Sequence, residues 1–81
     1  PNFGGAYYNL GYIYGELNNY EQSIYFYNKA VQQNFDLEAT LVNLALQEIK
    51  ANKKASACAH LEEAYQLGRT DIKPLMNKYC K

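Results

Sequence analysis

The residues of this sequence best suited to chemistry lie close together near its C-terminus: Cys58, His60 and Glu63. A thiol beside an imidazole can act as a nucleophile with its base, and thiol, imidazole and carboxylate groups can bind a metal ion. The spacing argues against both, because side chains two positions apart on a helix point to different faces. His60 is the only histidine, so further ligands at metal-site spacing are missing. We therefore predict no enzymatic activity, no cofactor and no metal, and interpret His60 as a structural residue.

The second cysteine, Cys80, stands at the C-terminal end. Two cysteines are too few for a disulfide-dense secreted scaffold, so they leave the compartment open. Cys58 lies on the helix face expected to pack against the next helix, and Cys80 lies near the end of that helix. Two alternatives follow: a pair of free buried thiols, or a disulfide, which needs α-carbons within about 7 Å of each other.

Composition limits the classes of partner. At 81 residues the chain is one domain with a thin core, and eight basic residues balance eight acidic ones. The charges separate along the chain, with a net charge of about −4 in residues 1–49 and about +4 in residues 50–81. Seven of the nine tyrosines lie in the acidic part. A basic patch with stacking aromatics is therefore missing, and we predict no nucleic-acid partner.

The sequence contains no recognisable targeting signal. Its apolar runs fall far short of the roughly 20 residues that span a bilayer, and no signal peptide is recognisable. We therefore predict no membrane insertion. The start at Pro1 rather than Met suggests a piece of a longer protein, so the localisation stays unknown.

An internal repeat organises the chain. A shift of 34 residues aligns identical residues at Asn9 and Asn43, Leu10 and Leu44, Asn18 and Asn52, Ala30 and Ala64, and Gln32 and Gln66. Each unit is expected to contain two helices, at about 5–17 and 20–33 and then at about 37–50 and 54–67, followed by a shorter helix at about 71–80. Asn19 and Asp36 are expected N-caps, and Gly68 is an expected left-handed helix end.

Small and aromatic residues alternate on the helix faces predicted to meet. Gly11 lies one turn from Tyr7 and Tyr14, while Ser23 lies one turn from Tyr27 on the second helix. A glycine inside a helix costs roughly 1 kcal/mol relative to alanine, so its presence indicates a close approach of two backbones. The aromatic rings then fill the space that the small side chains leave.

This pattern resembles the tetratricopeptide repeat. The residues that carry the resemblance are Tyr7, Leu10, Gly11, Tyr14, Tyr20, Ser23, Tyr27 and Ala30 in the first unit, and Leu41, Leu44, Ala45, Ala57, Leu61 and Ala64 in the second. Pro1 resembles the proline that closes a preceding repeat, and the C-terminal part resembles the capped ends of bacterial repeat proteins. Glu48 and Lys54 depart from the pattern by replacing aromatics, and Phe35 and Arg69 replace the closing prolines.

The resemblance implies an all-α fold, an α-solenoid of two helix-turn-helix units and a C-terminal capping helix, with five antiparallel helices. The implied boundaries are the end of a preceding repeat at 1–3, repeats at 4–37 and 38–71, and a cap at 71–81. It also implies a protein–protein interaction module that binds a peptide or a partner helix in a concave groove lined by the first helix of each repeat.

We expect this groove to contain Tyr8, Asn9, Tyr12, Val42, Asn43 and Leu46. Its aromatic and aliphatic character favours a ligand with apolar anchors, and the two asparagine amides could bond to the ligand backbone. Tyr8 and Val42 occupy positions where a carboxylate clamp would carry charge, which argues against capture of a peptide terminus. An alternative interpretation is that these side chains pack inside the protein, and a second function is a structural scaffold that self-associates as a homo-oligomer.

Overall fold

The computed structural model describes residues 2–81, which form five α-helices and one short 3-10 turn, with no strand among them. These elements are α1 (Gly4–Glu16), α2 (Tyr20–Gln32), α3 (Leu37–Lys50), α4 (Lys54–Gln66), η1 (Thr70–Ile72) and α5 (Lys73–Tyr79). Each predicted helix is present, and the last one begins two residues later than expected because η1 precedes it. The interpretation of Pro1 as the end of a preceding repeat lies outside the described residues.

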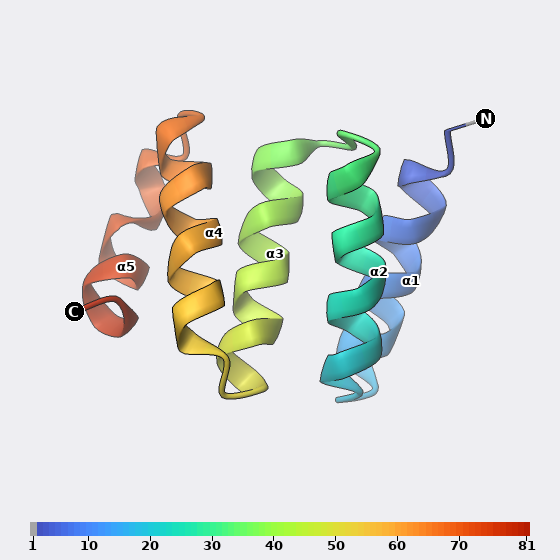
Figure 1. The fold of residues 1–81 in the computed structure, drawn as a ribbon, viewed down its shortest axis with the longest axis horizontal. Coiled ribbons are helices and arrows are strands. Elements are labelled where there is room, and N and C mark those ends of the chain that lie inside the picture. Colours follow the sequence, from blue (N-terminus) through green and yellow to red (C-terminus); the bar gives the residue numbers. More distant parts are fainter. Residues whose placement is uncertain (1) are drawn as a thin grey trace.

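The helices form two hairpins and a cap, as predicted. Consecutive helices pack side by side in alternating directions, and α5 with η1 covers the outer side of α4 (Figure 1). The molecule is elongated, with principal extents of 37 × 26 × 16 Å. The predicted fold class, an all-α helical-repeat solenoid with a C-terminal capping helix, is confirmed.

The ends of α1, α2, α3 and α4 share one backbone geometry. Each helix is followed by a residue with positive φ, at Asn18, Asn34, Asn52 and Gly68. After α1, the backbone N–H of Asn18 donates to Gly15 O at 3.0 Å and that of Asn19 donates to Tyr14 O at 2.9 Å. Equivalent pairs of bonds close the other three helices. Asparagine and glycine tolerate the left-handed conformation that this C-terminal motif needs, so they stop the helices at the same place in each repeat.

The two predicted N-caps do not act through their side chains. Asn19 and Asp36 do stand at the N-cap positions of α2 and α3, but neither makes a side-chain capping hydrogen bond. Asp36 is itself left-handed, with φ of 41°. At this end of α3 the hydroxyl of Thr40 instead donates to the carbonyl oxygen of Phe35 at 2.7 Å. The local sequence signal thus predicted where α2 and α3 begin, but not which hydrogen bonds form at their N-terminal ends.

Close contact between α1 and α2 depends on Gly11, as the spacing predicted. A Cβ atom at this position would lie 2.7 Å from Cδ1 of Tyr27, which is too close for any real side chain. Tyr27 is only 2% exposed, and burial raises the pKa of its hydroxyl to about 12. The hydroxyl of Ser23 donates to the backbone oxygen of Gly11 at 2.6 Å. This bond and the missing side chain together hold the two helix backbones close.

The larger part of the core lies between α3, α4 and the cap. Its buried residues are Leu41, Val42, Ala45, Ala57, Leu61, Ala64, Ile72 and Met76. A second, smaller buried cluster joins α2 to α3 and consists of Ile24, Tyr27 and Leu44. Since Ile72 and Met76 come from η1 and α5, the C-terminal segment completes the core of the second hairpin.

Candidate partner-binding surface

Three of the six predicted groove residues lie on α1 and three on α3. Tyr8 and Asn43 connect the two helices, because the Asn43 amide Nδ2 donates to the Tyr8 hydroxyl oxygen at 2.7 Å. The Tyr8 ring also packs edge-on against Tyr27, with centroids 5.6 Å apart, and against Phe35 at 5.5 Å. Both residues of the bonded pair are half-buried. They therefore position α1 relative to α3 and offer only their outer atoms to a ligand.

The other four residues differ in accessibility. Tyr12 is 56% exposed and Asn9 is exposed as well, so both can be reached from solvent. Leu46 is half-buried and packs against the core, while Val42 is 8% exposed and belongs to the same buried cluster as Ile72 and Met76. The expected floor of Tyr8, Tyr12, Val42 and Leu46 is therefore corrected at Val42, because that side chain is part of the core.

One polar residue near this surface was missed by sequence reasoning. The side chain of Gln47 packs on Gly15, where a Cβ atom would lie 3.0 Å from its Nε2 atom. Its Oε1 atom is buried and has no hydrogen-bond partner within residues 2–81. The only sequence signal was Gly15, the last of the four glycines in α1. Gly15 thus has the same use as Gly11, but it admits a side chain from α3 instead of one from α2.

A partly buried, hydrogen-bonded pair in the second hairpin was also missed. Nδ1 of His60 lies 2.7 Å from Oε1 of Glu48, with side-chain exposures of 27% and 5%. The hydrogen bond to Glu48 raises the pKa of His60, against the opposing effect of burial. The two residues sit 34 positions after Tyr14 and Phe26, which stack in the first hairpin with centroids 5.6 Å apart. The 34-residue register could have predicted this contact, because Glu48 and His60 replace two aromatic residues that face each other in the first hairpin.

Glu48 and His60 do not belong to a metal-binding cluster within residues 2–81. Nowhere within residues 2–81 do three His, Cys, Asp or Glu side chains gather in an arrangement that could hold a metal ion. The same described range contains no enclosed pocket. What Glu48 and His60 can do is hold α3 to α4 by a charge-assisted hydrogen bond.

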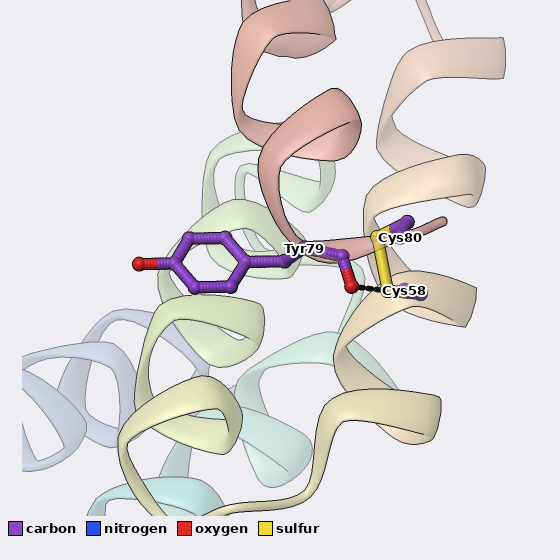
Figure 2. The surroundings of a disulfide bond; sticks show 3 residues. All are labelled: Cys58, Tyr79 and Cys80. Atoms are coloured by element: carbon purple, nitrogen blue, oxygen red, sulfur yellow. Dashed lines mark hydrogen bonds between the residues drawn. A yellow bond between two sulfur atoms is a disulfide. The ribbon is translucent and has the colours of Figure 1, made fainter.

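The two cysteines are bonded to each other in the structure. Their α-carbons lie 5.6 Å apart, and the bridge links α4 to the C-terminal end of α5 (Figure 2). The sulfur of Cys58 also lies 3.5 Å from the backbone oxygen of Tyr79. A disulfide sulfur carries no proton, so this contact becomes a hydrogen bond only when the bridge is reduced to thiols. Of the two alternatives left open by the sequence, the structure has the disulfide.

Comparison with known proteins agrees with this architecture. A family model described as tetratricopeptide repeat matches residues 5–36. This segment, which spans α2 and all of α1 except Gly4, therefore has the pattern of one tetratricopeptide repeat, and α3 with α4 repeats its helical hairpin in the same 34-residue register. No curated protein and no solved structure matches the chain.

The match of residues 5–36 to this family points to a class of function. Tetratricopeptide repeats generally mediate protein–protein interactions, and the family is a non-catalytic interaction repeat. No helix among residues 2–81 has the length and apolar character needed to cross a membrane. The likeness of the C-terminal part to bacterial capping segments stays a prediction.

Proposed function

We propose that the chain binds an extended or helical segment of another protein along the side of the solenoid formed by α1 and α3. The contact residues, which we call the binding strip, are Asn9, Tyr12, Asn43 and Leu46. Tyr8 supports the strip from beneath through its bond to Asn43. Val42 is left out because it is buried.

The bond between Tyr8 and Asn43 is the observation that carries this proposal. At 2.7 Å it joins the first helices of the two repeats on the side where the strip lies, and it sets their spacing before any ligand arrives. A surface that is already ordered loses less conformational entropy on binding, so more of the contact energy appears as affinity. The Asn43 Oδ1 atom takes no part in the bond to Tyr8, so it can accept a hydrogen bond from a ligand.

The chemistry of the strip selects the class of ligand. Tyr12 presents a large ring with a hydrogen-bonding tip and only two side-chain torsions to immobilise, which makes tyrosine a good anchor. The Asn9 amide can both donate to and accept from a peptide backbone. Helix α1 contains no basic residue, so it offers no counter-charge for a terminal carboxylate. The ligand is therefore a segment with apolar side chains, and two repeats give a short strip with affinity on the order of micromolar.

The test uses peptides selected against the whole chain from a displayed library of random 12-residue peptides. Tyr12→Glu should weaken binding of the selected peptides by at least about 30-fold, the loss typical of a central anchor. Tyr25→Glu is the matched control, because Tyr25 is 53% exposed against 56% for Tyr12 but lies on α2. The control should bind within about 3-fold of the unmodified chain, the scatter of surface substitutions.

Two results would contradict the proposal. One is an equal loss of affinity in both variants, which would mean that the peptides respond to general surface charge. The other is a large drop in the melting temperature of Tyr12→Glu, which would make Tyr12 a core residue. Leu46 is not used as the first test because its packing against the core would confuse binding with stability.

A further inference from the structure

One side of α1 carries apolar side chains that nothing in residues 2–81 covers. They are Phe3, Ala6, Leu10, Ile13 and Leu17, spaced alternately by three and four residues, and we call them the outer stripe. This spacing keeps side chains on one line along a helix and is typical of helices that pack against another helix. All five are exposed, and the exposed fraction reaches 54% at Phe3, 50% at Ile13 and 69% at Leu17.

The equivalent positions on α3 show how this side of a first helix is packed in the second repeat. Leu44 lies 34 residues after Leu10 and is fully buried, in a cluster with Ile24 of α2. Ala51, the equivalent of Leu17, is half-buried against the same cluster. On α3 these positions are covered by a neighbouring helix, whereas on α1 they face solvent. Within residues 2–81, the outer stripe is therefore a helix-packing surface that no helix covers.

The opposite end of the solenoid is closed and offers no matching apolar surface. Helix α5 covers α4 and is tied to it by the disulfide, so its inner residues belong to the core. The residues that α5 exposes are Lys73, Pro74, Asn77 and Lys78. A polar, basic end does not complement an apolar stripe, which disfavours head-to-tail stacking of copies.

We propose that two copies of this chain associate through their outer stripes, with α1 packed antiparallel against α1 around a two-fold axis. Such an interface uses the same patch on both copies and closes as a dimer. The stripe is self-complementary in this arrangement. Leu10 lies at its midpoint, near the axis; Phe3 of one copy lies opposite Leu17 of the other, and the small Ala6 lies opposite the larger Ile13. This dimer does not depend on the binding strip, since Tyr12 points to another side of α1.

The charges of α1 are compatible with this pairing. Its only charged residue is Glu16, so the two stripes bring no row of like charges together. Antiparallel packing places Glu16 of each copy toward the N-terminal end of the other α1. That end carries the positive pole of the helix dipole and has no acidic residue of its own in the first turn.

The first experiment measures the mass of the whole chain by sedimentation equilibrium over about 1 to 500 µM, the range that resolves micromolar association. The unmodified chain should approach twice the monomer mass. Ile13→Lys should stay monomeric, with the dissociation constant of the dimer raised at least about 100-fold, because two buried charges must be desolvated per dimer. Leu67→Lys is the matched control: Leu67 is 49% exposed, close to the 50% of Ile13, but lies at the end of α4, and this variant should dimerise normally.

A chain that is monomeric throughout this range overturns the proposal, and so does an Ile13→Lys variant that still dimerises. Circular dichroism of each variant checks that helicity is unchanged. The antiparallel register has its own test, in which Ala6→Glu and Ile13→Lys are mixed. Each variant alone should be monomeric, whereas the mixture should form a dimer because the new carboxylate faces the new ammonium. A monomeric mixture would overturn the antiparallel register.

Discussion

The two hairpins of this protein have the same backbone plan but different interiors. In the first, Gly11 admits the ring of Tyr27 against the helix backbone. In the second, the same two positions are Ala45 and Leu61, and both are fully buried. A larger residue on one helix is thus matched by a smaller residue on the other. The two hairpins therefore differ by a paired exchange at facing positions, from Gly11 with Tyr27 to Ala45 with Leu61.

A second pair of facing positions also differs between the hairpins, and here an aromatic pair is replaced by a polar one. Tyr14 and Phe26 stack in the first hairpin with their planes 6° apart. Glu48 and His60 take the equivalent positions in the second and form a hydrogen-bonded ion pair. An aromatic stack is insensitive to pH near neutrality, whereas a pair that contains histidine is not. The second hairpin therefore has a titratable connection that the first one lacks.

The largest expected effect concerns the cap, which only the second hairpin has. A chain ending at Gly68 loses the buried side chains of Ile72 and Met76 and the bridge to Cys58. Burial of the two side chains contributes about 1.5–3 kcal/mol each, and a bridge between residues 22 positions apart contributes about 3 kcal/mol. We expect the free energy of unfolding to fall by about 6–9 kcal/mol, measured by urea denaturation.

The full-length chain in its reduced form separates the two contributions. It keeps the apolar contacts of α5 and should lose only about 3 kcal/mol. If the shortened chain and the oxidised full-length chain melt at the same temperature, the second hairpin does not need its cap.

A second prediction exchanges the interior of one hairpin for that of the other. Gly11→Ala should cost about 2 kcal/mol through its clash with Tyr27, and Tyr27→Leu should cost a similar amount through the cavity it leaves. The double variant reproduces the pair found at Ala45 and Leu61. Its loss should be smaller than the sum of the two single losses by about 1 kcal/mol, measured as a coupling energy in urea unfolding.

Additive losses would show that positions 11 and 27 are independent. They would contradict the view that the facing residues of the two hairpins compensate for each other. Gly11→Leu gives the upper limit of the effect. Even the first carbon of that side chain would meet the Tyr27 ring at 2.7 Å, so this variant should lose about 3 kcal/mol or more.

The smallest effect concerns pH. The pKa of His60 in the folded protein lies above its ordinary value of 6.5, because the hydrogen bond to Glu48 favours the protonated ring. The pair's contribution is therefore complete below about pH 6.5 and is lost as pH rises through the folded-state pKa. We expect the free energy of unfolding to fall as the pH rises from acidic to mildly alkaline conditions, measured by urea denaturation at a series of pH values.

The matched variant for this prediction carries Glu48→Tyr and His60→Phe together, which copies the stack of the first hairpin. It should lose the pH dependence and keep its stability within about 1.5 kcal/mol of the unmodified protein, as expected when apolar residues replace a buried ion pair. A pH dependence that survives in this variant would assign the titration to another group.

Much of the fold could be predicted from the sequence alone because it depends on local spacing. The 34-residue shift, the small residues at Gly11 and Ser23, and the asparagines at positions 18, 34 and 52 each act within one helix or one turn. Their conformational preferences do not depend on what lies far away in the chain. They therefore determined the number of helices, their ends and the resemblance to the tetratricopeptide repeat, as well as the faces on which α1 and α2 meet.

Only the tertiary structure decided which residues on the predicted surface are accessible to solvent. It also decided which residues far apart in the sequence are in contact. The helical pattern placed Val42 on an open surface, but the core formed with η1 and α5 buries it. From the sequence, Glu48 was a departure from the repeat pattern and His60 an isolated structural residue, whereas α3 and α4 bring them within 2.7 Å. Each of these facts depends on a contact between separate helices, and such contacts are set by how the helices pack, which the periodicity of a single helix does not contain.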